Sequence, residues 1–185
     1  MRGTNNGADV RNALSDNELA EKARSDRSAF AELYERFFDK VYTYVFYRVG
    51  RRAAAEDIVA DTFLRALQHI GSFRARGGGF GAWLLRIARN RMIDYGRREK
   101  RLLPLSQVVP DTAASPEEAA INAETGENLR RLVAALPEEQ SEAVILKYAV
   151  GLKNREIAKI LGKSETAVSS LLHRALGKLR EGVGQ

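Results

Sequence analysis

Arginine side chains crowd one short stretch of this chain, AWLLRIARNRMIDYGRR at residues 82–98. Residues 86–101 contain seven Lys or Arg and only two acids. Apolar and aromatic residues recur between them at helical spacing, which predicts an amphipathic helix with a basic face. Guanidinium groups bind phosphate, and neutralising the phosphates of a nucleic acid releases counterions and strengthens binding. A solvated basic face on an ordinary helix is the alternative, and this stretch alone does not separate the two.

A second stretch, residues 152–180, has the spacing of a helix-turn-helix. Ala158 is small where two helices must approach, and Gly162 falls at the turn, where a left-handed backbone costs other residues about 1 kcal/mol. Ser164 can cap the second helix. The start of such a recognition helix contacts base edges in the major groove. The alternative for residues 152–180 is a plain helical hairpin with a glycine turn. The expected DNA-facing residues are Lys163, Ser164, Glu165, Thr166, Ser169, Ser170, His173 and Arg174.

Composition excludes several kinds of site. The chain has 185 residues, a net charge of +6 and no cysteine, so disulfides and thiolate metal sites are excluded. Its two histidines lie far apart, and no Ser-His-Asp spacing indicates catalysis. The glycine run at 77–79 lacks the lysine and serine of a phosphate-binding loop. We therefore expect no cofactor, no metal and no catalytic residues.

No targeting or membrane segment is predicted. The N-terminus lacks an apolar run, so no signal peptide is expected, and no stretch is long and apolar enough to span a membrane. The expected location is the cytoplasm. We also expect no further domain to be fused after the last helix.

Charge divides the chain into three parts. Residues 1–101 carry a net +7, residues 102–128 carry five acids and no base, and residues 129–185 carry a net +4. Three of the four prolines lie in the acidic part, and proline breaks helices and stiffens linkers. The predicted fold is all-α, with two small helical domains joined by an extended acidic linker. The expected boundaries are a disordered 1–14, a first domain over 15–101, a linker over 102–124 and a second domain over 125–185.

Local signals place the helices. Ser15 and Glu18 have the spacing of a capping box, which predicts a helix from Asp16. Gly50 and Gly71 are expected to stop the next two helices. A glycine-rich loop over 71–81 precedes the basic helix. In the second half, helices are expected around 129–136, from Pro137 to Gly151, over Asn154–Leu161 and over roughly Ser164–Arg180.

Three segments, in the same order, resemble the group IV (extracytoplasmic-function, ECF) sigma factors of bacterial RNA polymerase. AEDIVADTFLRAL at 55–67 is similar to the family's helix that binds the core polymerase. Residues 73–101 are similar to its segment that melts the promoter and reads the −10 element, and residues 136–180 to its −35-binding domain. The resemblance covers about residues 15–181.

The resemblance implies a role for each segment. The first would contact the clamp helices of the largest polymerase subunit, through Asp57, Asp61, Thr62, Leu64 and Arg65, and the polymerase flap is a further expected contact. The loop from Phe73 to Phe80 would receive a base flipped from the non-template strand. The −10 residues would be Phe73, Arg74, Arg76, Phe80, Arg86, Arg89, Asn90, Arg91, Arg97 and Arg98.

Other features take their meaning from the same resemblance. The acidic linker would thread the polymerase channels as a nucleic-acid mimic, or serve as a plain tether. Ser169 and Leu171 stand where the family often has a basic pair, so Leu171 is expected to pack on the domain core or on an inhibitor. Trp83 is expected in the core more than as a stacking platform. An anti-sigma protein is a further expected partner.

The predicted function is a transcription initiation factor that directs RNA polymerase to promoters and is not itself an enzyme. Strand opening would use binding energy from the polymerase and both DNA elements, so we expect the isolated chain to bind promoter DNA poorly. The alternative is a free-standing helix-turn-helix regulator, which usually dimerises on a palindrome. A nucleic-acid enzyme would need a metal or acid–base constellation that these residues do not offer.

Overall fold

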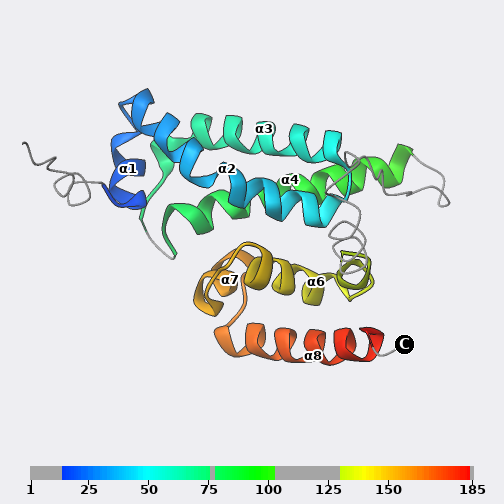
Figure 1. Ribbon diagram of the computed structural model, residues 1–185. Helices are drawn as coiled ribbons and strands as arrows, with labels where there is room; N and C mark the ends of the chain where they lie inside the picture. The colour runs from blue at the N-terminus through cyan, green and yellow to red at the C-terminus, as the bar shows by residue number, and fades with distance from the viewer. Residues whose placement is uncertain (1–13, 76–77, 103–129, 184–185) are drawn as a thin grey trace, which may run out of the picture.

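The computed structural model describes residues 14–75, 78–102 and 130–183. Its first half is a bundle of α1 (Asp16–Lys22), α2 (Arg27–Val49), α3 (Arg52–His69) and α4 (Gly79–Leu102). A short 3₁₀ turn, η1 (Ile70–Ser72), ends α3. Helices α2, α3 and α4 lie alongside one another, and α1 contacts both α2 and α4 at one end of the bundle (Figure 1).

Side-chain and glycine caps set the ends of these helices. The Glu18 N–H donates to Ser15 Oγ at 3.4 Å and the Ser15 N–H donates to Glu18 Oε2 at 2.9 Å, which confirms the predicted capping box. Asp26 caps α2 by accepting the Ser28 N–H at 2.8 Å. Gly50 ends α2 in the left-handed conformation with φ 74°, as predicted.

The second half is also helical, as Figure 1 shows. Residues 130–134 are helical, followed by α6 (Glu138–Val144), a π-helical turn η2 (Ile145–Ala149), α7 (Asn154–Leu161) and α8 (Glu165–Val183). No β-strand occurs in the described ranges, and the predicted all-α fold is confirmed. The predicted helix from Pro137 is present, but its last turn is π-helical rather than α-helical.

The two halves pack directly on one another. Contacts join α4 to α7 and α2 to η2, and one cluster of buried apolar side chains extends through both halves. Val41 and Leu85 of the first half belong to this cluster, as do Leu146 and Ile157 of the second. The linker predicted over 102–124 lies outside the described residues, except for Leu102 at the end of α4.

Gly162 forms the turn of the helix-turn-helix with φ 67°, while Gly177 lies inside α8. A Cβ added to either would meet no atom within 4 Å, so the two positions differ in backbone conformation rather than in space. We expect Gly162→Ala to lower the free energy of unfolding by about 1 kcal/mol. Gly177→Ala should instead raise it by about 0.5–1 kcal/mol, because alanine favours the helix. Urea denaturation of both variants tests this, and an equal effect at the two positions would contradict it.

Candidate nucleic-acid interface

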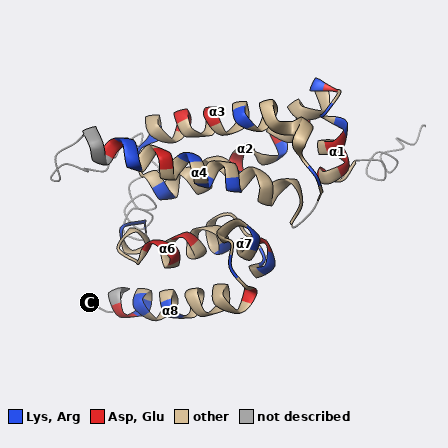
Figure 2. Ribbon diagram, turned by 180° about the vertical axis from the view of Figure 1, so that it is seen from behind, with Lys and Arg blue, Asp and Glu red and all other residues tan. Residues whose placement is uncertain are grey.

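Helix α4 has an apolar face and a basic face, as the sequence predicts. Leu84, Leu85, Ala88 and Met92 are buried against the rest of the bundle. Lys and Arg recur along α4, and the ribbon of Figure 2 marks their positions in blue. Of the residues expected to contact −10 DNA, Arg86, Asn90, Arg97 and Arg98 are exposed, and Arg89 and Arg91 are partly buried.

Arg91 connects α4 to α3. Its Nε lies 2.6 Å from Asp61 Oδ2, and its Nη1 lies 3.0 Å from Asp94 Oδ2. Its side chain is only 13% exposed. Asp61 also faces Arg65 at 3.2 Å. Two residues expected to face different partners, DNA and polymerase, are therefore ion-paired with each other here.

Two arginines of α4 contact the second half of the chain. Arg86 Nη2 donates to the Lys159 carbonyl at 2.6 Å, and Arg89 Nε donates to Glu142 Oε1 at 3.0 Å. A third polar contact, an ion pair, joins Arg48 of α2 to Glu138 at 2.8 Å. The second half therefore occupies part of the basic face that the sequence assigns to DNA.

Glu142 is the centre of this contact. It is 2% exposed, and its Oε1 accepts the Tyr44 hydroxyl at 2.5 Å as well as Arg89. A buried carboxylate is costly unless it is paired and hydrogen-bonded, and these two partners satisfy it. We call Glu142, Tyr44 and Arg89 the Glu142 cluster. Burial, and then the charge of Glu142, raise the pKa of Tyr44 well above its usual range.

The raised pKa of Tyr44 predicts a loss of stability in alkali. A tyrosine in the unfolded chain ionises near pH 10, roughly, and the folded protein holds this proton more tightly. The stability that protonated Tyr44 contributes is therefore complete below that pH and is lost as the pH rises toward the raised pKa. We expect the free energy of unfolding, measured by urea denaturation, to fall less steeply with pH for Tyr44→Phe than for wild type across this range. Tyr148→Phe, which alters a tyrosine that is 58% exposed, should follow wild type, and equal slopes for all three proteins would contradict the prediction.

The two phenylalanines that flank the glycine-rich loop are buried. Phe73 and Phe80 are each 1% exposed, with their ring centroids 5.7 Å apart. Trp83 lies 5.4 Å from Phe73 and 5.6 Å from Phe80, in partly buried contact with the core. The expectation that Phe73 and Phe80 contact DNA is corrected, because core packing uses both rings. They anchor the two ends of the loop instead.

Of the two arginines in this loop, the structure describes only Arg74. Arg74 is exposed, and its Nη1 donates to the carbonyls of Gly71 at 3.1 Å and Phe73 at 2.7 Å. Arg76 lies outside the described residues.

The outer face of α3 carries exposed apolar and charged side chains together. Leu64 is 53% exposed, Leu67 is 39% exposed, and Asp57 is also exposed. Thr62 is fully buried and donates its hydroxyl to the Ile58 carbonyl at 2.7 Å, so the expectation that it faces a partner is corrected. Leu64 and Leu67 are three positions apart, so they are neighbours on the helix surface and form one exposed apolar patch.

Sequence analysis missed a row of aromatic side chains on α2. Tyr34, Phe38, Tyr42 and Phe46 follow one another at four-residue spacing, with neighbouring ring centroids 5.3–6.0 Å apart. Tyr34 also lies 4.6 Å from Phe63 of α3. The regular spacing was the available signal, but it indicates a buried stripe as readily as an exposed one.

The helix-turn-helix brings six of its eight predicted residues to one groove, whereas Ser164 and Glu165 do not line it. Ser164 Oγ accepts the Ala167 N–H at 3.1 Å, so it caps α8 as predicted. Leu171 is 5% exposed, which favours packing on the domain core over contact with an inhibitor. Lys163 Nζ lies 2.8 Å from Glu139 Oε1, so one cation of the groove already has a partner. The predicted residues that line the groove are Lys163, Thr166, Ser169, Ser170, His173 and Arg174.

The described ranges offer neither a metal site nor a membrane span. They contain no group of three or more His, Cys, Asp or Glu side chains that could hold a metal ion. None of the helices described is both long enough and apolar enough to cross a bilayer.

Two family models match the chain. Sigma-70 region 2 matches residues 33–102, which include α3 and α4, and Sigma-70 region 4 matches residues 126–179, which include the helix-turn-helix. Among solved structures, CnrH in complex with the cytosolic domain of CnrY is similar with a TM-score of 0.73 and 26% identity, over 91% of this chain and 97% of that one. RpoE of Bartonella quintana, in complex with the anti-sigma factor NepR, shares the fold with a TM-score of 0.69 at 24% identity, over 82% of this chain and 94% of that one.

Curated relatives extend the match over most of the sequence. The ECF RNA polymerase sigma factor BldN of Streptomyces coelicolor is 38% identical over 167 residues, which is 88% of this chain and 63% of BldN. The ECF RNA polymerase sigma factor SigW of Bacillus subtilis is 31% identical over 171 residues, which is 85% of this chain and 90% of SigW. The chain therefore belongs to the ECF family of RNA polymerase sigma factors.

Proposed function

We propose that this sigma factor binds core RNA polymerase through the outer face of α3 and contacts promoter DNA through α4 and α8. The observation that carries the proposal is the order of the two family matches, because one covers the exposed face of α3 and the basic face of α4, and the other covers the helix-turn-helix. The polymerase performs the chemistry, and the sigma factor is no enzyme. We expect it to act in the cytoplasm, where the polymerase and the promoters are.

The burial pattern refines which residues act in each contact. The residues that we expect to contact the polymerase are Asp57, Leu64 and Arg65. Thr62 is buried, and Asp61 is ion-paired with Arg91. The −35 duplex would be read from the groove at the start of α8, which includes Ser170 and Arg174. Phosphates of the opened −10 region would be held by Arg86, Arg89, Arg97 and Arg98.

The packing of the two halves explains why the isolated chain should bind DNA weakly. Arg86 and Arg89 are engaged by Lys159 and Glu142 of the second half. DNA must displace these contacts before it can use the arginines. Polymerase binding would draw the two halves apart and expose them, so that strong promoter binding requires the assembled holoenzyme.

A reconstitution experiment tests this function. Core polymerase with and without the full chain is mixed with a random duplex library, and bound sequences are selected and then tested in run-off transcription. We expect enrichment of a two-element promoter and new transcripts only when the chain is present. Equal binding of the same duplex by the chain without polymerase would support the rival regulator, particularly if the selected sites were palindromes.

Leu64 offers a direct test of the polymerase contact. Its side chain is 53% exposed, so Leu64→Ala should leave the stability of the isolated chain nearly unchanged. If the side chain is buried on the polymerase, its loss should weaken binding by about 2 kcal/mol, or roughly thirtyfold. Leu14→Ala, at another exposed leucine of the same half, is the control and should bind like wild type. Equal titration curves for the three proteins against core polymerase would exclude the α3 contact.

We also propose that an inhibitory protein binds this chain. The structural relatives CnrH and RpoE are each solved with a protein partner, which for RpoE is the anti-sigma factor NepR. The exposed leucines and the aromatic row near α3 offer such a partner an apolar surface. A pull-down of the inhibitor with purified wild-type chain, repeated with Leu64→Ala, would identify it and locate its contact.

A further inference from the structure

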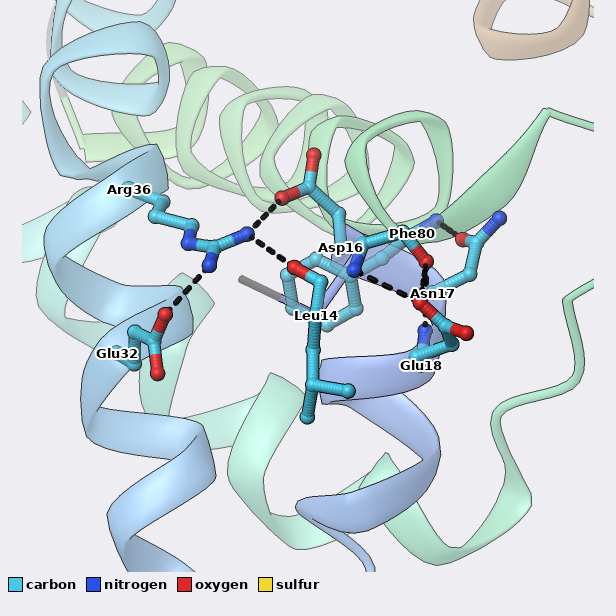
Figure 3. A network of polar contacts seen from close by, with 8 residues as sticks. Leu14, Asp16, Asn17, Glu18, Glu32, Arg36 and Phe80 are labelled. Atoms are coloured by element: carbon cyan, nitrogen blue, oxygen red, sulfur yellow. Dashed lines mark hydrogen bonds and ion pairs between the residues drawn. The ribbon is translucent and has the colours of Figure 1, made fainter. Parts of the chain in front are cut away.

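Helix α4 is fixed at its start by a contact from another helix. The Phe80 N–H donates to Asn17 Oδ1 of α1 at 2.9 Å, as Figure 3 shows. The first N–H groups of a helix have no partner within it, and a side-chain oxygen that accepts one of them stabilises the helix start. Arg36 of α2 in turn donates to the Leu14 carbonyl at 3.0 Å and to Asp16 Oδ1 at 2.9 Å, which holds α1 in place. The start of α4 is therefore tied to the bundle.

The far end of α4 has less support. Among the side chains of α4 that the structure describes, Met92 is the last one that is buried. Gly96 lies beyond it, and glycine weakens a helix because it loses the most conformational freedom when it becomes ordered. The helix nevertheless continues past Gly96 to Leu102. A helical stretch this short is not stable by itself in water, so it needs a contact from elsewhere in the protein.

Arg51 supplies that contact. Its Nη2 donates to the Tyr95 hydroxyl and to Glu99 Oε1, and the Tyr95 hydroxyl donates to the same Glu99 oxygen at 2.9 Å. Tyr95 and Glu99 are four positions apart, so they lie on one face of the helix, one before Gly96 and the other after it. We call Arg51, Tyr95 and Glu99 the Arg51 clamp. The clamp bridges the helix across its glycine.

The turn between α2 and α3 holds Arg51 in place. Gly50 ends α2 in the left-handed conformation, and the Arg51 carbonyl accepts the Ala55 N–H at 2.9 Å at the beginning of α3. The Arg51 side chain is 32% exposed and that of Glu99 is 26% exposed, so solvent screens their attraction only in part. The contact therefore joins a fixed corner of the bundle to the end of α4.

We propose that Arg51 is a positioning residue that keeps the end of α4 helical and thereby presents Arg97 and Arg98 to promoter phosphates. The inference rests on the proposed function, in which these two arginines hold phosphates. Both are exposed, and both lie within the segment that the Arg51 clamp spans. If this segment unwound, DNA binding would have to restore the helix first, and the entropy lost in that ordering would lower the affinity.

Binding of wild-type and variant holoenzyme to the promoter that the wild type selects tests the proposal. We expect Arg51→Ala to weaken this binding about fivefold, in line with the loss of a charge-assisted contact that is partly exposed. Arg52→Ala is the matched control, because it removes the neighbouring arginine, which is exposed and pairs with Glu56 within α3 at 2.9 Å. The control should bind within about twofold of wild type. Wild-type binding by Arg51→Ala, or an equal loss in Arg52→Ala, would overturn the inference.

Replacing Gly96 separates positioning from direct contact with DNA. A Cβ at Gly96 would meet no atom within 4 Å, so alanine fits there. Alanine favours the helix over glycine by about fivefold in an equilibrium constant. Adding Gly96→Ala to Arg51→Ala should therefore restore binding to within about twofold of wild type. Adding Gly177→Ala, which favours the helix in α8 instead, should restore nothing. No rescue by Gly96→Ala, or equal rescue by Gly177→Ala, would contradict a role that acts through α4.

A double-mutant cycle shows whether Arg51 acts through the two arginines. With Arg97→Gln and Arg98→Gln already present, Arg51→Ala should change promoter binding by less than about twofold, because the groups that it positions are gone. An undiminished loss in that background would assign Arg51 a phosphate contact of its own and overturn the inference.

Hydrogen exchange in the isolated chains measures the order of the helix end directly. The amides of residues 97–99 should exchange faster in Arg51→Ala than in wild type, and should return to the wild-type rate when Gly96→Ala is added. Unchanged exchange in Arg51→Ala would contradict the proposal. If Arg51→Ala fails to fold, Tyr95→Phe replaces it in all of these measurements, because it removes the hydroxyl that contacts both other members of the clamp and leaves the net charge unchanged.

Failure of this inference is distinguishable from failure of the proposed function. If the Arg97→Gln and Arg98→Gln double variant loses promoter affinity while Arg51→Ala does not, only the role of Arg51 is lost. If the double variant binds like wild type, or if core polymerase does not assemble with the wild-type chain, the proposed function fails and the positioning role fails with it.

Discussion

Glu142→Ala is expected to loosen the packing between the two halves of the protein. The substitution removes the one carboxylate that both Tyr44 and Arg89 contact, and leaves a buried phenol without its partner. Breaking a fully buried ion pair costs about 3–5 kcal/mol, and about 2–3 kcal/mol is expected here because Arg89 is 29% exposed and can turn to water. We expect the contact between the halves to open when it loses that much stabilisation.

Two measurements detect the opening. Small-angle X-ray scattering should show a larger radius of gyration for Glu142→Ala than for wild type. The isolated variant should also bind DNA more tightly, since Arg86 and Arg89 no longer face the second half. Glu181→Ala is the matched control, because it also removes one carboxylate from the second half but from an exposed position near the end of α8. Scattering and DNA affinity that stay at wild-type values in Glu142→Ala would show that the cluster does not hold the halves together.

Glu142→Gln separates hydrogen bonding from charge. The amide oxygen can still accept the Tyr44 hydroxyl, but the attraction to Arg89 becomes a neutral contact. An intermediate opening is expected, because hydrogen bonds to charged groups are worth more than neutral ones. An effect as large as that of alanine would assign the whole contact to the ion pair with Arg89.

Local sequence signals were sufficient for most of the helices, although not for the 3₁₀ turn η1 or the π-helical turn η2. The Ser15 and Glu18 capping box, the stop at Gly50 and the turn at Gly162 each depend on a few neighbouring residues, and the structure has all three. The basic face of α4 was equally visible, because its periodicity is local. The resemblance of three ordered segments then identified the family, which the family models confirm.

Contacts between distant residues could not be predicted in the same way. Phe73 and Phe80 were assigned to DNA, but they are buried because four aromatic rings meet at the end of the bundle. A glutamate such as Glu142 carries no sign in the sequence that it will be buried beside a tyrosine 98 positions away. The cap from Asn17 to Phe80 spans 63 positions and follows no local rule. Each of these depends on tertiary packing, which a single sequence does not specify by spacing.

Arg97 and Arg98 should carry much of the electrostatic contact with the promoter. Both are exposed near the end of α4, and the Arg97 side chain is 76% exposed. Neither contacts the second half in any hydrogen bond or ion pair described here, so both are available whether the halves are packed or apart. Each phosphate contact adds about 0.9 to the slope of log affinity against log salt concentration. Replacing both arginines with glutamine should therefore reduce that slope by about 1.8 and weaken promoter binding roughly sixtyfold at 0.1 M salt.

A control variant is needed to separate the loss of phosphate contacts from the loss of net positive charge. Arg24→Gln with Arg52→Gln removes the same two charges from exposed positions outside α4, and should change the slope by less than about 0.5. Holoenzyme binding to one promoter at several salt concentrations gives both slopes. The α4 variant should also lose affinity for unrelated sequences to the same extent, because phosphates carry no base identity. A loss confined to the selected promoter would instead assign Arg97 or Arg98 to base reading, and equal slopes in both double variants would remove α4 from the phosphate contact.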